Sequence, residues 1–298
     1  MITVAGLTKH YGRRIAVANL TFDIAAGRVT GFVGPSGAGK STTMRMMVGL
    51  TRPDRGDVRY NGIPYTRLLH PARLVGSVLD ARCMHPGRTA RNHLLAAAAL
   101  NRVPARRVTE VLGVVGLESA ADQRAGGFSL GMRQRLALAG ALLAEPEVLL
   151  LDEPSNGLDP DGIRWLRNSL TNFAAGGGAV FVSSHLIAEL AMFADDLVVV
   201  GAGRLIVAEP LRATLARGGS TVVVRTPQAV ELARLLERHG ITAALTAERL
   251  HVTGAATATV SAIAFDNRIQ VTEITETTRS LEEILLEMTG ASTQFAAA

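Results

Sequence analysis

Residues 34–41 read Gly-Pro-Ser-Gly-Ala-Gly-Lys-Ser and match G-x-x-x-x-G-K-[ST], the pattern of a phosphate-binding loop that runs from a strand into a helix. The glycines at 34, 37 and 39 let the backbone turn tightly and direct its N–H groups inward, where they can bind anionic oxygens. The flanking sequence fits, because residues 29–33 are typical of a buried strand and residues 40–50 have apolar side chains at helical spacing. The loop therefore predicts an α/β chain that binds a phosphate-bearing ligand.

Within this loop, Lys40 is positioned to reach the outer phosphates of a nucleotide and Ser41 to ligate Mg²⁺. The alternative is an ordinary glycine-rich turn, but the strand before it and the helix after it argue against that interpretation. Lys9 and Lys40 are also the only lysines in the chain, so a chance placement of one here is improbable.

The length of 298 residues suits a large domain with a small companion domain. No apolar run reaches the roughly 18 residues that span a bilayer; the best candidate, residues 136–151, is broken by Glu145, Pro146 and Glu147. No signal peptide follows Met1, and the single cysteine, Cys83, excludes an internal disulfide. We therefore expect a cytoplasmic protein.

The formal net charge is +5, which would suit nucleic acid or an anionic membrane surface. All but two of the 31 basic residues are arginines, however, and they are scattered among acids and form no blocks. We therefore expect no nucleic-acid partner.

Residues 2–7 and 15–24 read as strands joined by a turn, which favours an antiparallel edge sheet. Tyr11 lies in this basic turn, where its ring could stack on a base or only cap a hairpin.

A buried strand at 75–79 ends at Asp80, and helical patterns follow at 90–100 and 104–112. Residues of about 81–145 are therefore predicted to form a helical subdomain inserted in the sheet.

Residues 128–135 form a polar, glycine-containing segment that leads into an apolar helix at 136–143. The first-turn N–H groups and the dipole of such a helix can bind an anion, and Ser129 adds a hydroxyl donor. The alternative is that Ser129 only caps its own helix, and this segment taken alone favours the cap.

Residues 147–154 form an apolar run that ends in two carboxylates, Asp152 and Glu153. A buried strand of this kind carries acid to the carboxyl edge of a parallel sheet, where ligands of open α/β folds bind. We expect Asp152 to hold the Mg²⁺ shell and Glu153 to polarise the attacking water. The alternative is that Asp152 and Glu153 are only the solvated end of a strand, but this is hard to reconcile with a phosphate loop in the same chain.

The next segments are a turn at 156–160, a helix at 161–172 that Pro160 begins, and a buried strand at 179–182. His185 follows that strand and could contact a γ-phosphate, although a local backbone hydrogen bond is the more frequent role of such a histidine. Further strands are predicted at 197–201 and 204–207, and a short helix at 211–216.

The chain resembles the ATP-binding subunit of ABC transporters in the order of its motifs. These are the phosphate loop, the serine-glycine helix start, the strand that ends in Asp-Glu, the Leu-Asp turn and the histidine at a strand end. The resemblance covers about residues 1–219. It is closest to the antibiotic and multidrug exporter branch, where the segments Ser-Leu-Gly-Met-Arg-Gln-Arg and Asn-Gly-Leu-Asp-Pro are familiar. It implies an α/β P-loop NTPase cassette with a mixed sheet core, an antiparallel edge sheet and a helical subdomain.

By this resemblance, Tyr11 stacks on the adenine of ATP, and Ser129 and Gly131 belong to a signature that binds the ATP held by another protomer, so that a dimer encloses two ATP molecules. The other implied roles are the Walker B carboxylate for Asp152, the general base for Glu153, a cross-interface contact for Asp159 and the switch histidine for His185. The implied Walker A segment comprises Gly34, Pro35, Ser36, Gly37, Ala38, Gly39, Lys40, Ser41 and Thr42.

The chain departs from the family pattern at two places. The commonest signature reads Leu-Ser-Gly-Gly-Gln, and its first glycine and its glutamine correspond to Leu130 and Met132 here. Asp80 aligns with a glutamine that usually ends the strand before the helical subdomain. Asp80 can still contact Mg²⁺ or water, but its part in coupling to a membrane partner is put in doubt.

The resulting hypothesis is an ATPase that works as a homodimer or heterodimer and drives a separate membrane permease for export of a drug-like or lipophilic compound. The subunit would then lie on the inner face of the membrane through its permease. One alternative is a non-transport ABC ATPase acting on nucleic acid or ribosomes. A P-loop kinase or GTPase is disfavoured, since it would not need a signature helix between the loop and Asp152.

Residues 220–298 contain no catalytic constellation and are predicted to form a small α+β accessory domain. Its hypothetical role is dimer contact or regulation. The pattern predicts strands at 221–225, 242–245, 250–253 and 269–274 and helices at 229–239 and 256–265. Ser280 and Glu283 form a capping box, the apolar stripe of Leu281, Ile284, Leu285 and Met288 is typical of core packing, and residues 291–298 are expected to fray.

Overall fold

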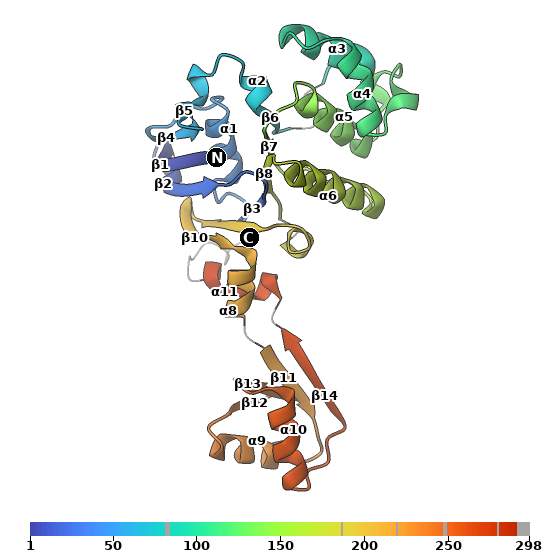
Figure 1. Ribbon diagram of the computed structural model, residues 1–298. Coiled ribbons are helices and arrows are strands. Elements are labelled where there is room, and N and C mark those ends of the chain that lie inside the picture. The colour runs from blue at the N-terminus through green and yellow to red at the C-terminus, as the bar shows by residue number, and fades with distance from the viewer. Residues whose placement is uncertain (81–83, 186, 219, 247–248, 279, 291–298) are drawn as a thin grey trace. The chain divides into compact units, whose positions relative to one another are not determined.

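The computed structural model describes residues 1–80, 84–185, 187–218, 220–246, 249–278 and 280–290 (Figure 1). Met1–Leu211 and Arg212–Met288 belong to two separate compact units. Cys83 and the predicted frayed end at 291–298 lie outside the described residues.

An antiparallel sheet forms one edge of the first unit, as predicted. Its strands follow the order β2 (Arg14–Ile24), β1 (Ile2–Tyr11), β4 (Arg55–Tyr60) and β5 (Ile63–Pro64). Leu20, Phe22 and Ile24 alternate with exposed residues along β2, because successive side chains of a strand point to opposite faces. β1 continues to Tyr11, which pairs with Arg14, and is therefore longer than the predicted strand.

A six-stranded sheet forms the centre of the unit, in the order β10 (Arg204–Pro210), β9 (Asp196–Gly201), β3 (Val29–Val33), β8 (Ala179–Ser183), β7 (Val148–Leu151) and β6 (Val75–Val78). β9 to β6 are parallel and β10 is antiparallel to β9. Every residue of β3, β7 and β8 is buried, as expected for parallel strands covered on both faces. The carboxyl ends of β3, β8 and β7 are therefore neighbours at one edge.

The helices of the first unit are α1 (Lys40–Met47), α2 (Pro71–Leu74), α3 (Ala90–Leu100), α4 (Arg106–Val114), α5 (Leu130–Leu142), α6 (Pro160–Ala175) and α7 (Ile187–Leu190). α8 (Leu211–Arg217) begins at the last residue of this unit and continues into the second. Short 3₁₀ turns occur at Tyr65–Arg67, Glu118–Ala120 and Ala125–Gly127. α5 begins directly after Ser129, which caps it by accepting a hydrogen bond from the Met132 N–H. The N-cap interpretation of Ser129 is thus confirmed. None of the helices in the described ranges is both long and apolar enough to cross a membrane.

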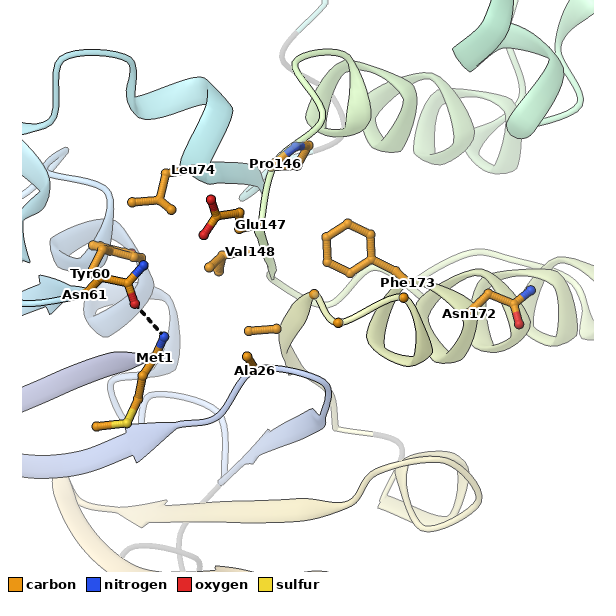
Figure 2. Close-up of a pocket in the computed structure, with 14 residues that line it drawn as sticks. Met1, Ala26, Tyr60, Asn61, Leu74, Pro146, Glu147, Val148, Asn172 and Phe173 are labelled. Carbon is orange, nitrogen blue, oxygen red and sulfur yellow. Dashed lines mark hydrogen bonds between the residues drawn. The ribbon is translucent and has the colours of Figure 1, made fainter.

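The amino ends of the parallel strands border a cavity of about 490 Å³. Figure 2 shows Leu74, Glu147 and Phe173 around it, and the amino group of Met1 donates a hydrogen bond of 2.8 Å to Asn61 Oδ1 at its rim. A strand of four residues rises roughly 13 Å. The length of the sheet therefore separates this cavity from the phosphate loop.

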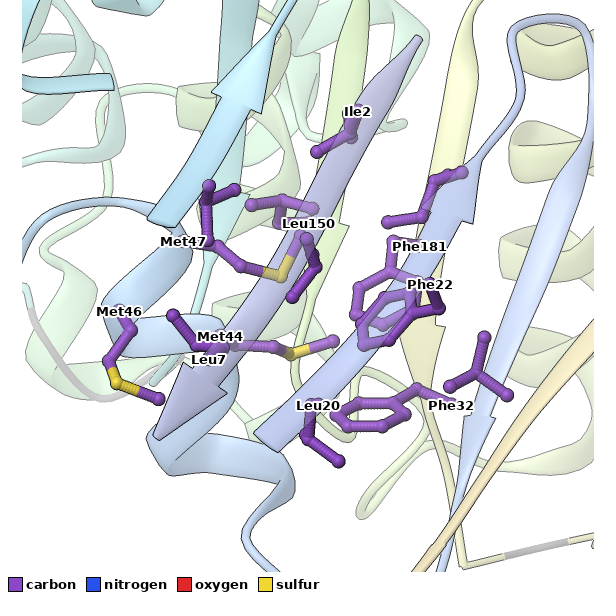
Figure 3. Packing of buried hydrophobic residues seen from close by; sticks show 14 of the residues in the cluster. Ile2, Leu7, Leu20, Phe22, Phe32, Met44, Met46, Met47, Leu150 and Phe181 are labelled. Carbon is purple, nitrogen blue, oxygen red and sulfur yellow. The ribbon is translucent and has the colours of Figure 1, made fainter. Parts of the chain in front are cut away.

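The main hydrophobic core lies between the antiparallel sheet, α1 and the six-stranded sheet (Figure 3). Phe22 of β2, Phe32 of β3 and Phe181 of β8 stack in its middle, with centroids 5.6 Å apart for Phe22–Phe181 and 4.8 Å for Phe32–Phe181. The methionines Met44 and Met47 of α1 fill the adjacent space and are fully buried. This packing fixes the strand before the loop and the helix after it in one rigid body.

The helical subdomain has a core of its own, which α3, α4 and α5 share through residues such as Leu94, Val111 and Leu136. Arg135 of α5 places its guanidinium 4.1 Å from the ring centroid of Trp165 on α6 and donates a hydrogen bond of 3.0 Å to the Val115 carbonyl. The cation–π contact stabilises the placement of α5 against α6.

The second unit contains a four-stranded antiparallel sheet in the order β12 (Thr242–Thr246), β13 (Arg249–Thr253), β11 (Ser220–Arg225) and β14 (Glu273–Thr278). Besides α8, the second unit contains the helices α9 (Ala229–Arg238), α10 (Thr257–Asp266) and α11 (Leu281–Gly290). The predicted capping box is confirmed by hydrogen bonds between Ser280 and Glu283 in both directions. Leu281, Ile284 and Leu285 are buried.

The predicted strand at 269–274 is wrong. The Ile269 N–H donates a hydrogen bond of 2.8 Å to the Ala264 carbonyl and so closes the end of α10, and β14 starts only at Glu273. Ile269 and Val271, in the connection between α10 and β14, contact the apolar core of the second unit. Their alternating spacing is therefore like that of a strand, although they lie outside β14.

Asp54 anchors the turn that carries Tyr11. Its carboxylate accepts hydrogen bonds from the His10 N–H at 2.6 Å and from Lys9 Nζ at 3.0 Å. The hydrogen bond from the His10 backbone, followed by that from Lys9, lowers the pKa of the Asp54 carboxyl to about 2. The ionised carboxylate thus holds the end of β1 against the start of β4.

Replacement of Phe181 by alanine should lower the free energy of unfolding by about 3–5 kcal/mol, because the fully buried ring leaves a cavity that the stacked neighbours cannot refill. Urea unfolding followed by fluorescence or circular dichroism measures this change. Leu69→Ala serves as the control, since Leu69 is 92 % exposed and should change stability by less than about 0.5 kcal/mol. Equal effects of the two substitutions would contradict the described core.

Asp54→Asn should reduce stability above about pH 4, and the difference should shrink as the pH falls and disappear below about pH 2. A carboxyl whose pKa is lower in the folded state stabilises that state above its unfolded pKa, and this stabilisation disappears as the pH falls through the folded value. Unfolding free energies of both proteins across this pH range measure the difference. Asp23→Asn is the control, because Asp23 is an exposed residue of β2. A constant difference at all pH values would show that the charge of Asp54 is not the cause.

Candidate functional site

The loop between β3 and α1 approaches neighbouring backbone so closely that two of its glycines cannot be replaced without displacement. A Cβ on Gly34 would lie 2.3 Å from the Val200 carbonyl oxygen, and one on Gly39 would lie 2.4 Å from that of Ala16. Gly39 also has a φ of +98°, which favours glycine. The spacing of the motif therefore reflects packing of the loop onto β9 and β2 as well as freedom to bind an anion.

A cavity of about 510 Å³ opens at this loop. It brings Tyr11, from the antiparallel sheet, and Glu153, from the end of β7, to the predicted phosphate loop. Arg14 and Ala16 of β2 also line it, and sequence reasoning did not identify them, although Arg14 continues the basic turn around Tyr11. The lining residues are Tyr11, Arg14, Ala16, Pro35, Ser36, Gly37, Gly39, Lys40, Ser41, Thr42 and Glu153.

Lys40 lies at the base of this cavity with only 9 % of its side chain exposed. Its ammonium donates a hydrogen bond of 2.6 Å to the Gly34 carbonyl and lies 3.8 Å from Glu153 Oε1. Burial lowers the pKa of Lys40 below its ordinary value, while the charges of Glu153 and Asp152 oppose that shift. A buried ammonium in such a place favours any further negative charge, including that of phosphate.

Glu153 contacts His185 as well as Lys40. Its Oε2 lies 2.6 Å from His185 Nδ1 and accepts a hydrogen bond of 3.2 Å from the His185 N–H. An ionised carboxylate only accepts hydrogen bonds, so the proton of the shorter contact belongs to Nδ1 and Nε2 is the other polar atom of the ring. The predicted residues Glu153 and His185 are thus brought together at the carboxyl ends of β7 and β8.

Asp152 and Glu153 share a partner that sequence reasoning missed. Ser183, the last residue of β8, donates a hydrogen bond of 2.6 Å to Asp152 Oδ1 and accepts one of 2.9 Å from the Glu153 N–H. The available signal was a serine at the end of an otherwise apolar buried strand.

The predicted signature segment and Leu-Asp turn contact each other, but their residues do not line the cavity within the part of the chain that is described. Leu130 packs against Gly157, where a Cβ would lie 2.0 Å from Leu130 Cδ2, and a Cβ on Gly131 would lie 3.5 Å from Leu158. Ser129 caps α5, and Asp159 caps α6 by accepting a hydrogen bond of 2.7 Å from the Gly162 N–H.

The residues predicted to hold a metal provide only oxygen donors. Ser41 lies in the cavity lining, and Asp152 and Asp80 follow the paired ends of β7 and β6, where Leu151 is the register partner of Val78. Hydroxyl and carboxylate oxygens are the donors that Mg²⁺ prefers. This donor set therefore fits Mg²⁺.

Comparison with known proteins gives a consistent result. The family model described as "ABC transporter" matches residues 17–156, and a model described as "Domain of unknown function (DUF8746)" matches residues 220–282. The bacitracin transport ATP-binding protein BcrA of Bacillus licheniformis is 37 % identical over 209 residues, which are 69 % of this chain and 68 % of that protein.

A dimeric ATP-binding cassette in a post-hydrolysis state, bound to ADP and Pi, superposes with a TM-score of 0.65 at 26 % identity and covers 71 % of this chain and 99 % of its own. The uncharacterized ABC transporter ATP-binding protein YhcH of Bacillus subtilis (strain 168) is 33 % identical over 293 residues, which are 97 % of this chain and 96 % of that protein. These similarities agree with the phosphate loop and the carboxylates beside it. The chain belongs to the ATP-binding proteins of the ABC transporter family.

Proposed function

We propose that this chain hydrolyses ATP at the Lys40–Glu153–His185 site and that the energy drives a separate membrane permease. The observation that carries the proposal is that a buried lysine and a carboxylate line one cavity together with the phosphate loop. The imidazole of His185 contacts that same carboxylate. Catalysis of phosphoryl transfer consists mostly of positioning and charge stabilisation, and these three groups can provide both.

In this proposal, the backbone N–H groups of residues 34–42 and the ammonium of Lys40 bind the phosphates, while Tyr11 stacks on adenine. Ser41 and Asp152, with Asp80 directly or through water, would hold Mg²⁺. When bound, Mg²⁺ would neutralise charge on the phosphate oxygens. The phosphates would then replace Gly34 and Glu153 as partners of the Lys40 ammonium.

Glu153 is proposed as the general base and His185 as the residue that orients it. The Glu153 carboxylate can accept a proton from a water molecule aligned with the γ-phosphate. The contact with His185 Nδ1 fixes the carboxylate. It leaves Nε2 to accept a hydrogen bond from the water or, when the imidazole is doubly protonated, to donate one to the phosphate.

A single chain would form only half of each site. Ser129 and Gly131 begin a helix of thirteen residues, α5, whose first-turn N–H groups suit a phosphate, and yet they do not line the cavity described above. We propose that they bind the ATP held by a second copy or a homologous subunit, with Asp159 at the interface. The dimeric state of the similar cassette supports this arrangement.

We propose that the transported compound is drug-like or lipophilic and that it is exported. The name of the similar Bacillus licheniformis protein, which refers to bacitracin transport, supports this class of compound. The resemblance of the signature segment to the exporter branch supports the direction. The subunit would be held at the inner face of the membrane through its permease. Residues 1–219 are proposed to be the cassette and residues 220–298 an accessory domain. Purification from detergent-solubilised membranes should recover a multi-span partner with the chain.

Glu153→Gln should bind ATP but hydrolyse it roughly 10²- to 10⁴-fold more slowly, because the amide cannot accept the proton of the attacking water. Lys40→Ala should lose ATP affinity, since the cavity then lacks its buried cation. Steady-state phosphate release and equilibrium binding of ATP separate the two effects. Normal turnover by Glu153→Gln would refute the proposed base, and unchanged affinity of Lys40→Ala would refute the proposed phosphate site.

A further inference from the structure

Ser183 lies at the point where the three strands of the site meet. It ends β8, has no solvent exposure, and is the register partner of Phe32 in β3. The residues before it in β8, from Ala179 to Val182, are all apolar and buried. The interior of the sheet therefore gives no reason for a hydroxyl at this position.

The two hydrogen bonds of Ser183 have a defined direction. A hydroxyl has one proton to donate, and the Glu153 N–H can only donate, so the oxygen of Ser183 accepts at 2.9 Å. Its proton is then given to Asp152 Oδ1 at 2.6 Å, a length typical of a hydrogen bond to an ionised carboxylate. The two partners are adjacent carboxylate residues of the proposed site, 31 and 30 positions away in the chain.

The backbone of Glu153 adds a second reason to assign a role to this hydroxyl. Glu153 has a φ of +50°, a left-handed conformation that is unfavourable for a residue other than glycine and persists only where the surroundings hold it. The hydrogen bond from its N–H to Ser183 is one of the contacts that hold it. This conformation directs the Glu153 side chain toward Lys40 and His185.

We propose that Ser183 is a positioning residue that fixes Asp152 for the metal and Glu153 for proton transfer at the same time. The inference rests on the proposed function of these two carboxylates. Ser183 itself need not touch ATP or water, because it acts through its two partners. Its hydroxyl couples the metal-binding carboxylate to the general base, so the two cannot be displaced independently.

Ser183→Ala should lower kcat about 10- to 100-fold, the range found when a buried hydrogen bond to a charged or metal-binding group is removed. The Mg²⁺ concentration for half-maximal activity should rise about 10-fold, and the Kd for ATP in EDTA should stay unchanged. In a Glu153→Gln background, which slows turnover, the gain in ATP affinity on adding Mg²⁺ should shrink when Ser183 is also replaced. Ser183→Thr keeps the hydroxyl and should recover most of the Mg²⁺ dependence.

Thr30→Val is the matched control. Thr30 is a buried residue of the neighbouring strand β3, and its hydroxyl has no hydrogen-bond partner among the described residues. Its replacement removes a buried hydroxyl of the same sheet and should leave kcat and Mg²⁺ dependence as in the unmodified chain.

Two results would overturn the role of Ser183. One is a Ser183→Ala protein with unchanged kcat and Mg²⁺ dependence, and the other is a loss of activity that Thr30→Val reproduces. Failure of the proposed function would give results that differ from both of these. The unmodified chain would then hydrolyse no ATP, or the Glu153→Gln protein would remain active.

Discussion

The site depends on the parallel order of β3, β8 and β7. Neighbouring strands of a sheet lie about 4.8 Å apart, and parallel strands end at the same edge, so the phosphate loop, His185 and Glu153 are brought together although they come from three distant segments. The register partners Phe32 and Ser183 in β3 and β8, and Val182 and Leu151 in β8 and β7, set this alignment. The stacked rings of Phe22, Phe32 and Phe181 hold the same strands from the side of the core.

The charges at this edge suit an anionic ligand. Lys40 is buried, which disfavours its charged form, and the carboxylates of Glu153 and Asp152 compensate only in part. The phosphates of ATP would complete this compensation and would draw the ammonium away from Glu153. Glu153 would then keep His185 and the hydrogen bond from its N–H to Ser183 as its fixed contacts. Binding and preparation of the proposed base are thus linked through one lysine.

Local patterns predicted much of this structure. The strand at 29–33 and the helix at 90–100 have the predicted bounds, because a short apolar run after a turn and an apolar helical period are strong signals. Ser129 was predicted as an N-cap from the polar, glycine-containing segment around it, and the hydrogen bond from the Met132 N–H confirms that cap. The strand predicted at 269–274 failed because apolar residues of a connection can pack into a core without pairing.

The site was less predictable than the motifs that compose it. The phosphate loop is one continuous segment, and the two carboxylates are adjacent residues of another segment. The contacts of Glu153 with Lys40 and His185, in contrast, depend on strand order. Ser183 could not be identified from its neighbours, since both of its partners lie about thirty residues earlier. Tyr11 had two interpretations from its own turn, and only the family resemblance favoured a place at the nucleotide. The pairing of β1 with β2 brings it into the cavity lining.

In the proposed mechanism, one chain forms only half of an ATP site. Sedimentation of the Glu153→Gln protein with and without ATP tests this most directly, together with a second protein that also carries Gly131→Asp. A side chain at position 131 fits the fold, since its Cβ would make only an ordinary contact of 3.5 Å with Leu158, and an acid in the first turn of a helix is favourable. ATP should convert the Glu153→Gln protein from monomer to dimer, while the protein that also carries Gly131→Asp should bind ATP and stay monomeric. A monomer that persists with saturating ATP, or a dimer that tolerates the added charge, would contradict it.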